Sequence, residues 1–192
     1  ETLSYKDRKE LAFNYIIDEC FDRMGNKTLK VFDAIEETGI KLLAYEYYIT
    51  ACKNSVRKQI SDDYKAKRKG NKYVSALRKK LIQEGTSIHD DVYEADDLIA
   101  DRALELKSEG KNYIVVSIDK DLKQIEGYHF DYYPIKVFNE ETQRKEFVRY
   151  KGLSYTSKNE SYMMIALQML MGDAGDGVLA LKGIGQKKAE KI

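Results

Sequence analysis

The chain has 192 residues, and its 33 Lys or Arg residues nearly balance 32 Asp or Glu residues to give a formal net charge of +1. Hydrophobic residues make up 43% and charged residues 34%, which is ordinary for a globular domain with a sizeable core. No apolar run is long enough to cross a membrane, and no signal peptide is recognisable. The two cysteines, Cys20 and Cys52, lie far apart, so we expect a reduced, cytoplasmic protein rather than a disulfide-stabilised or membrane protein.

The N-terminal quarter predicts helices followed by a strand. Apolar residues at helical spacing between Leu11 and Phe21 indicate an amphipathic helix that Gly25-Asn26 ends. A second helix is predicted from Thr28 to about Leu43. Residues 45–50 are rich in Tyr and β-branched residues and predict a strand.

The segment 53–80 is strongly basic, with eleven Lys or Arg against two Asp. It has little apolar surface to bury before a predicted amphipathic helix at residues 73–83. One interpretation is a solvated face; the other is an element that grips phosphates, with Tyr64 stacking on a base. Residues 89–101 carry six acids and no Lys or Arg. Opposite fields in one chain suit a polyanionic substrate that is bound in one place and cut in another.

The acidic segment places Glu94, Asp96 and Asp97 within four positions at the start of a predicted helix. A helix N-terminus attracts acids through its dipole, which is the simpler explanation. Three clustered carboxylates also repel one another, and a fold tolerates them most easily when a cation shares the site. Two further acidic clusters downstream favour the cation.

The first downstream cluster follows a predicted strand. Residues 111–118 form a short apolar run typical of a strand buried in a parallel sheet, and Asp119 and Asp121 lie at its C-terminal end, where ligand sites form in open α/β sheets. Residues 128–137 and 147–150 predict an edge hairpin with Pro134 at an edge or bulge. His89 and His129 lie in dissimilar contexts and are expected at the surface, so no nucleophile with a partner base is predicted.

The second downstream cluster lies in a glycine-rich turn after an apolar helix predicted at residues 157–171. This turn carries Asp173 and Asp176 three residues apart. It is followed by a Gly-Ile-Gly turn and a lysine-bearing helix, which together present free backbone N–H groups and positive charge to a phosphate diester. The residues of this second turn are Gly183, Gly185, Lys187 and Lys188.

The three clusters together have a chemical logic. Their carboxylates can converge at the C-terminal edge of one sheet, and hard oxygen ligands select Mg²⁺ or Mn²⁺. Two such ions about 4 Å apart activate a water and stabilise the leaving oxygen of a phosphodiester. We therefore predict metal-dependent phosphodiester hydrolysis. The seven candidate ligands are Glu94, Asp96, Asp97, Asp119, Asp121, Asp173 and Asp176.

These motifs, in this order, resemble the 5′-nuclease family: flap endonucleases, bacteriophage 5′–3′ exonucleases and the nuclease domains of bacterial DNA polymerases. The resemblance runs from about Tyr45 to Ile192. It is most specific in Glu-Ala-Asp-Asp, Ser-Ile-Asp-Lys-Asp, and Gly-Asp-Ala-Gly-Asp-Gly followed by Leu-Lys-Gly-Ile-Gly. The short chain is most similar to phage members, acting in a bacterial or phage-infected cell. The resemblance implies an α/β fold: a PIN-like parallel, mixed-edge sheet flanked by helices at residues 1–155, with an arch at 53–80. The start of a helix-hairpin-helix-type (helix-three-turn-helix) module would occupy residues 156–192.

The resemblance also implies roles for individual residues. Glu94, Asp96 and Asp97 would serve the first Mg²⁺ and the bridge to the second, and the other four aspartates would define the second, with Mn²⁺ able to substitute. Lys65 and Arg68 match the Tyr-Lys-x-x-Arg element that contacts the scissile phosphate, and Lys67 lies between them. The Gly-Ile-Gly hairpin would hold duplex DNA, with K⁺ as a further ion. The implied partners are DNA with 5′ ends, flaps or nicks, RNA primers as an alternative substrate, and replication proteins.

Two departures from the family pattern bear on activity. The first strand of the family carries a metal-binding Asp; Asp33 lies too close to residues 45–50 to be its equivalent, so we expect that strand upstream of Glu1. An Asp expected after the next strand falls on or near Ala51, which cannot bind metal, whereas Gly177 in place of Asn is a minor change. Three hypotheses remain: a structure-selective 5′ nuclease, a catalytically weakened relative that binds branched DNA without cutting it, and a PIN-type ribonuclease. The Gly-Asp turn and the Gly-Ile-Gly hairpin argue against the ribonuclease.

Overall fold

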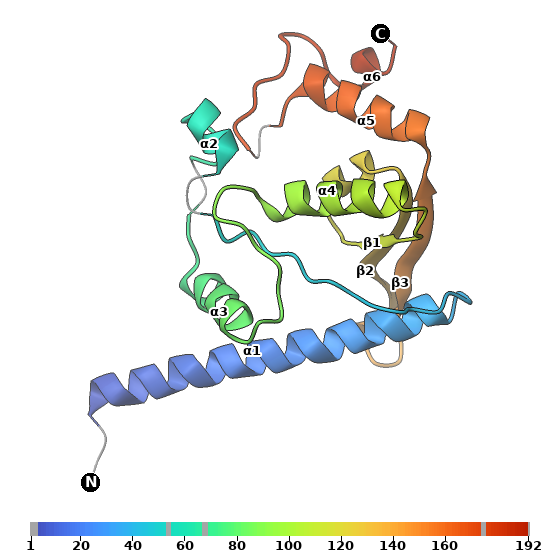
Figure 1. Cartoon of the computed structure of the whole chain (residues 1–192). Helices are drawn as coiled ribbons and strands as arrows, with labels where there is room; N and C mark the ends of the chain where they lie inside the picture. The colour runs from blue at the N-terminus through green and yellow to red at the C-terminus, as the bar shows by residue number, and fades with distance from the viewer. Residues whose placement is uncertain (1–3, 53–54, 67–68, 174–175, 192) are drawn as a thin grey trace. The chain divides into compact units, whose positions relative to one another are not determined.

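The computed structural model describes residues 4–52, 55–66, 69–173 and 176–191 (Figure 1). The chain forms two compact units, each described here by itself. One unit comprises Glu1–Ile49 with Lys69–His89, and the other comprises Thr50–Arg68 with Asp90–Ile192. No helix in the described ranges is long and apolar enough to cross a membrane. The division at residues 155 and 156 expected from the family stays a prediction.

A single long helix dominates the first unit. Helix α1 runs over Tyr5–Glu36 and begins with a capping box, in which the Asp7 backbone N–H donates to Ser4 Oγ at 3.2 Å. The predicted break at Gly25-Asn26 is wrong. One helical Gly costs only about 1 kcal/mol relative to Ala, which the helical residues on both sides outweigh. The second predicted helix is therefore the end of α1, which stops before Gly39, a residue with φ of +86°.

Helix α3, Lys72–Gln83, packs against α1 and confirms the helix predicted at residues 73–83. The rings of Phe13 and Tyr73 lie 5.2 Å apart, and Lys80 Nζ lies 2.5 Å from Asp18 Oδ1. The strand predicted at residues 45–50 is wrong. Only an isolated parallel bridge between Tyr48 and Ile88 forms there, because no described strand lies alongside to extend the ladder.

The second unit is built on a mixed sheet of three described strands in the order β1-β2-β3. Strand β1, Ile114–Val116, pairs parallel with β2, Gly127–Asn139, and β2 pairs antiparallel with β3, Arg144–Thr156. Val115 and Phe130 are buried in its core. Pro134 lies at a register shift, which confirms the predicted bulge.

His129 corrects a second expectation. Its side chain is only 4% exposed, because it faces the core near the start of β2, the central strand, and its Nε2 lies 2.8 Å from the Ile125 carbonyl oxygen. Burial lowers the pKa of His129, so it is a neutral core residue. His89 is exposed as expected.

The second unit also contains helical elements, one of which lies alongside β1 (Figure 1). They are α2 (Val56–Ile60), α4 (Ala95–Ser108), the 3₁₀ turn η1 (Asp121–Gln124), α5 (Lys158–Met171) and α6 (Gln186–Ala189). Helix α5 follows β3 directly through the capping residue Ser157, and it contacts both η1 and α6. The predicted α/β fold, a mixed sheet with flanking helices, is confirmed. The assignment of α5 and α6 to a helix-hairpin-helix module stays a prediction.

Continuity of α1 through Gly25 makes a direct prediction. No heavy atom beyond the local helix backbone lies within 4 Å of where a Gly25 Cβ would stand. Gly25→Ala should therefore stabilise the protein by about 0.5–1 kcal/mol, because Ala loses less backbone entropy in a helix. The melting temperature measured by circular dichroism should rise by about 2 °C.

The matched control is Gly39→Ala, at a residue with φ of +86° and equally open space. It should destabilise the protein by about 1 kcal/mol because of its left-handed backbone. A loss of stability in Gly25→Ala would show that the helix is broken at residue 25.

Candidate functional site: an acidic cluster with internal cations

The N-terminus of α4 holds the first acidic segment. Glu94 is the N-cap residue; its backbone N–H donates to Asp97 Oδ2 at 3.0 Å, and the next N–H, of Ala95, donates to Thr50 Oγ1 at 3.0 Å. These bonds satisfy N–H groups that the first helical turn leaves free. The Glu94 side chain is only 3% exposed, whereas Asp96 and Asp97 remain partly exposed. A buried carboxylate at this position requires nearby positive charge.

Arg57 on α2 supplies part of that charge. Its Nη1 lies 3.2 Å from Glu94 Oε2 and 2.8 Å from Asp96 Oδ2, and its Nη2 lies 2.6 Å from Asp97 Oδ1. Burial alone would lower the pKa of Arg57, but the hydrogen bond and charge of Asp96 outweigh it and raise the pKa. Sequence reasoning did not single out Arg57. Its only signal was membership of the basic segment, in which Lys65, Lys67 and Arg68 had been singled out instead.

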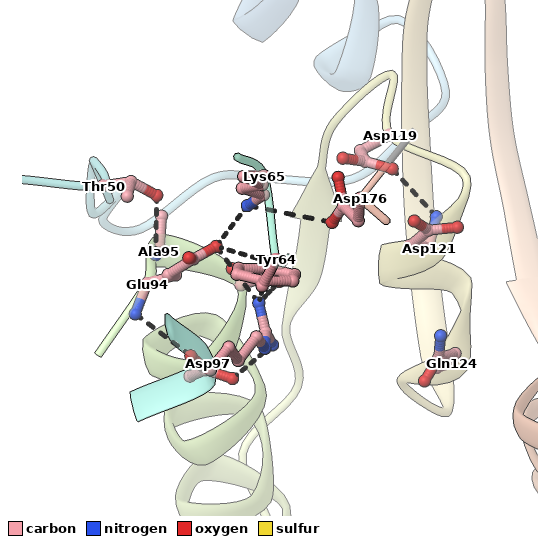
Figure 2. Close-up of polar contacts among 12 residues, drawn as sticks. Thr50, Tyr64, Lys65, Glu94, Ala95, Asp97, Asp119, Asp121, Gln124 and Asp176 are labelled. Carbon is pink, nitrogen blue, oxygen red and sulfur yellow. Dashed lines mark hydrogen bonds and ion pairs between the residues drawn. The ribbon is translucent and has the colours of Figure 1, made fainter. Parts of the chain in front are cut away.

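Lys65 supplies the second cation and joins two acidic segments. Figure 2 shows its Nζ between Glu94 Oε2, at 2.5 Å, and Asp176 Oδ2, at 3.9 Å. Burial opposes charging of both partners, yet their hydrogen bond raises the pKa of Lys65 and, with Arg57, lowers the pKa of Glu94. Ionised Glu94 therefore stabilises the folded protein at pH values above the usual pKa of Glu. This contribution is lost as the pH falls through the lowered pKa of Glu94.

Tyr64 is buried in this conformation. Its ring is 6% exposed, and its hydroxyl donates to Glu94 Oε2 at 3.2 Å. Lys65 Nζ lies 4.8 Å from the ring centroid. The Tyr64 ring packs inside the charged cluster, and its stacking on a base stays a prediction. Lys67 and Arg68 lie outside the described residues.

The second acidic segment follows β1. The Asp121 backbone N–H donates to Asp119 Oδ1 at 3.0 Å, and Gln168 Nε2 on α5 donates to Asp121 Oδ1 at 2.5 Å. Gln124 in turn hydrogen-bonds to Gln168. Burial, followed by the charge of Asp119 and then of Asp173, raises the pKa of Asp121. Like charges held together in this way are the condition under which a bound cation is favourable.

The third segment is the glycine-rich turn after α5. The turn closes on itself through an antiparallel bridge between Asp173 and Val178, and the Asp176 backbone N–H donates to Asp173 Oδ1 at 3.2 Å. It also docks on the segment that carries Lys65, whose backbone N–H donates to the Asp176 carbonyl oxygen at 3.0 Å. Lys65 has a φ of +54°, a strained conformation for a residue with a side chain.

Close backbone approach at Gly177 explains why a glycine stands there. Its φ is +79°, and a Cβ would stand 2.5 Å from the Asp63 carbonyl oxygen. Residues 62–66 and the Gly-Asp turn can therefore meet backbone to backbone. This packing constraint could not be predicted from the sequence, because it joins Gly177 to Asp63, a residue far away in the chain.

The Gly-Ile-Gly turn is open around both glycines. Gly183 has a φ of +78° with nothing within 4 Å of a Cβ, and Gly185 precedes α6 with equally open space. Lys187 is exposed, and Lys188 Nζ donates to the Gly183 carbonyl oxygen at 3.4 Å. A role for this turn in holding DNA or K⁺ stays a prediction.

Contacts link the first and third acidic segments, and the charge of the third reaches the second segment of the same unit. Lys65 joins Glu94 to Asp176, the turn joins Asp176 to Asp173, and Asp173 acts electrostatically on Asp121. Among the residues that the structure describes, no three His, Cys, Asp or Glu side chains are close enough to hold one metal ion. The donor chemistry nevertheless fits a divalent cation, because these are hard carboxylate oxygens with unbalanced negative charge at Asp119 and Asp121. The assignment of seven metal ligands stays a prediction.

Comparison with known proteins places these features in context. No family model matches the chain. It is 32% identical over 149 residues to a flap endonuclease Xni of Shewanella sediminis, covering 72% of this chain and 53% of that protein. It is 30% identical over 147 residues to DNA polymerase I of Rhizobium leguminosarum, covering 71% of this chain and 13% of that protein. The chain thus spans about half the length of the curated flap endonucleases that it matches.

Solved structures share the fold at lower identity. The 5′-exonuclease of bacteriophage T5 with bound zinc ions has a TM-score of 0.53 at 16% identity, covering 87% of this chain and 65% of the other. A bacteriophage T5 flap endonuclease in a complex with DNA and metal ions has a TM-score of 0.50 at 19% identity, covering 86% and 65%. These likenesses bear out the predicted α/β fold.

The backbone contact at Gly177 yields a prediction about the site. Gly177→Ala should push the Gly-Asp turn away from Asp63, because a Cβ cannot stand 2.5 Å from a carbonyl oxygen. We expect a loss of about 2–4 kcal/mol in the free energy of unfolding, measured with urea.

Gly183→Ala is the matched control, since its φ of +78° is the same and its surroundings are open. It should cost only the left-handed strain, about 1 kcal/mol. Equal losses in the two variants would show that the turn does not depend on close approach to Asp63.

Proposed function

Because this chain belongs to the 5′-nuclease family, we propose that it hydrolyses phosphodiester bonds of DNA, as a 5′–3′ exonuclease or a structure-selective flap endonuclease. The observation that best supports this proposal is the linkage of two distant acidic segments through Lys65, with Glu94 at 2.5 Å on one side and Asp176 at 3.9 Å on the other. A cation between carboxylates from distant segments is the arrangement expected where metal and phosphate are to meet.

Two Mg²⁺ ions are the proposed cofactors, with Mn²⁺ as a substitute. Glu94, Asp96 and Asp97 would hold one ion, and the aspartates after β1 and in the Gly-Asp turn would hold the other. When bound, the metals would lower the pKa of a water and stabilise the leaving oxygen of the phosphodiester. The metal-bound structures of the T5 5′-exonuclease, which has the same fold, are consistent with a divalent ion here.

The chain's own residues would position the substrate. Lys65 is held protonated by Glu94 and would donate from Nζ to a phosphate oxygen, together with Arg68 from the same element. Gln168 fixes the rotamer of Asp121 through its 2.5 Å hydrogen bond, so that carboxylate would not have to reorient before a metal binds. Partial burial around Glu94 and Tyr64 excludes water and strengthens these electrostatic interactions.

The proposed substrates are DNA with 5′ ends, flaps or nicks, with RNA primers as an alternative. The Gly-Ile-Gly turn with Lys187 and Lys188 would hold the duplex away from the carboxylates, which repel bare phosphate, and K⁺ is a candidate ion there. Replication proteins are candidate partners, since one relative is a DNA polymerase I, and the cytoplasm is the proposed location.

Digestion of a 5′-labelled flap and a blunt duplex tests this function. The protein should release labelled product with Mg²⁺ and none with EDTA. Asp121→Ala should lower the cleavage rate by about a thousandfold or more while changing DNA affinity by less than about threefold, because a ligand to the metal acts mainly in the transition state.

The control for this variant is Glu126→Gln, which removes an acid that pairs with Lys107 at 2.5 Å on the same unit. Its cleavage rate should match that of the wild type. Metal-independent cleavage, or an Asp121→Ala variant that cuts at the normal rate, would refute the proposed mechanism.

Ala51 favours a second candidate, a relative that binds branched DNA with little cleavage. It lies next to Thr50, whose Oγ1 accepts from the Ala95 N–H at the start of α4, and next to Cys52, whose pKa is raised by burial and by the charge of Glu94. The segment therefore borders the acidic cluster, where the family places an Asp. An Ala there removes one candidate ligand.

The two candidates differ in their response to Ala51→Asp. A weakened relative should gain Mg²⁺-dependent flap cleavage by about tenfold or more, since a missing ligand typically costs that much. A fully competent nuclease should change by less than about threefold. The rates are measured on the same labelled flap, with Ala51→Asn as the variant of similar size and lower ligand charge.

A further inference from the structure

The Arg57 guanidinium lies where three candidate metal ligands converge. Its Nη1 donates to Glu94 Oε2 at 3.2 Å and to Asp96 Oδ2 at 2.8 Å, and its Nη2 donates to Asp97 Oδ1 at 2.6 Å. Nη1 also lies 3.3 Å from the Tyr64 hydroxyl. The three carboxylates thus share the Arg57 guanidinium, and Glu94 Oε2 binds Lys65 as well.

A divalent ion would have to compete for these oxygens with cations of the chain itself, since Lys65 Nζ also lies 2.5 Å from Glu94 Oε2. Glu94 Oε2 and Asp96 Oδ2 both accept from the same Arg57 nitrogen atom, so a divalent ion that bound both oxygens would compete with that nitrogen for them. The guanidinium and a divalent ion are therefore competing bridges between these two carboxylates.

The charges explain why the protein needs a cation here without metal. Glu94, Asp96 and Asp97 carry three negative charges within one helical turn, and Glu94 is nearly fully buried. Arg57 and Lys65 together supply two positive charges, which leaves one unbalanced. With a divalent ion in place of Arg57, the same carboxylates and Lys65 would be electrically neutral, so the exchange is favourable in charge.

Arg57 is also able to leave. Its side chain is 36% exposed, in contrast to the 20% of Lys65, and it extends from a helix of only five residues. The long side chain can therefore turn toward solvent without unpacking a core. Arg57 has the position of a counter-ion and the exposure of a group that can be displaced.

We infer that Arg57 is an internal counter-ion that holds Glu94, Asp96 and Asp97 in place before metal binds, and that a divalent ion must displace its guanidinium from them. The inference rests on the proposed function, which assigns metal to these carboxylates. It makes Arg57 a positioning residue that competes with the cofactor. Metal affinity is then weaker, and the metal-free protein more stable, than the carboxylates alone would allow.

Mn²⁺ binding to the whole chain, followed by electron paramagnetic resonance of free Mn²⁺, tests the inference. Arg57→Gln should bind Mn²⁺ about tenfold more tightly than the wild type, because no guanidinium has to be displaced. Arg57→Lys keeps the charge but loses the fork, and its affinity should lie between the two. The matched control is Arg102→Gln, which removes an equal charge from α4 where Arg102 pairs with Glu105 at 2.6 Å. Its affinity should change by less than about twofold.

Thermal melting separates displacement from a merely structural role. In EDTA, Arg57→Gln should melt below the wild type, and saturating Mn²⁺ should raise its melting temperature by more than it raises that of the wild type. A structural role alone would lower both the melting temperature and the Mn²⁺ affinity.

The outcomes are distinct. Unchanged or weaker Mn²⁺ binding by both Arg57→Gln and Arg57→Lys would overturn the inference and leave the proposed nuclease intact. If Arg102→Gln bound Mn²⁺ as tightly as Arg57→Gln does, the change in net charge would explain the effect, and the inference would again be overturned. An absence of saturable Mn²⁺ binding by every protein, the wild type included, would overturn both the metal site and the inference.

Discussion

Neutralisation of Glu94 is the interaction on which the acidic cluster depends. A carboxylate that is only 3% exposed could not remain ionised without a partner. Arg57, on α2, and Lys65, in the loop that follows α2, both reach it from one short segment. The cations also determine where that segment lies, since Lys65 binds the Gly-Asp turn through both its side chain and its backbone. Lys65 and Arg57 therefore balance the charge of Glu94 and also determine the path of the segment that carries them.

Backbone packing then brings the last acidic segment into range. The contact between Gly177 and the Asp63 carbonyl oxygen is possible only without a Cβ, and the left-handed Lys65 lies directly beyond it. Strain at Lys65 is offset by the bonds that its ammonium makes to Glu94 and Asp176. Strained backbone and charged side chains occur together here, which is common where a fold positions groups for binding or chemistry.

Short-range sequence patterns predicted the structure correctly where the conformation of a segment depends on the segment's own residues. The helix predicted at residues 157–171, the bulge at Pro134 and the apolar stripe of α3 all follow from short-range geometry, and the structure contains each of them. Such patterns failed where the residue costs the helix little free energy, or where the segment needs a distant strand with which to pair. Gly25 did not end α1, because a single glycine is a weak breaker within 32 helical residues. Residues 45–50 have strand composition, but a strand needs a neighbour with which to pair, and only an isolated bridge at Tyr48 forms.

The sequence by itself determined the chemistry available to this protein: three acidic clusters at recognisable spacing, a basic segment, and a glycine-rich turn, together with the family to which they belong. Residue type and short spacing suffice for that, because they reflect charge and local backbone geometry. Only the tertiary structure decided that Arg57 would meet the carboxylates, that Tyr64 and His129 would be buried, and that Gly177 would touch Asp63. Those outcomes depend on contacts between segments up to about a hundred residues apart, and such contacts form only when the whole unit packs.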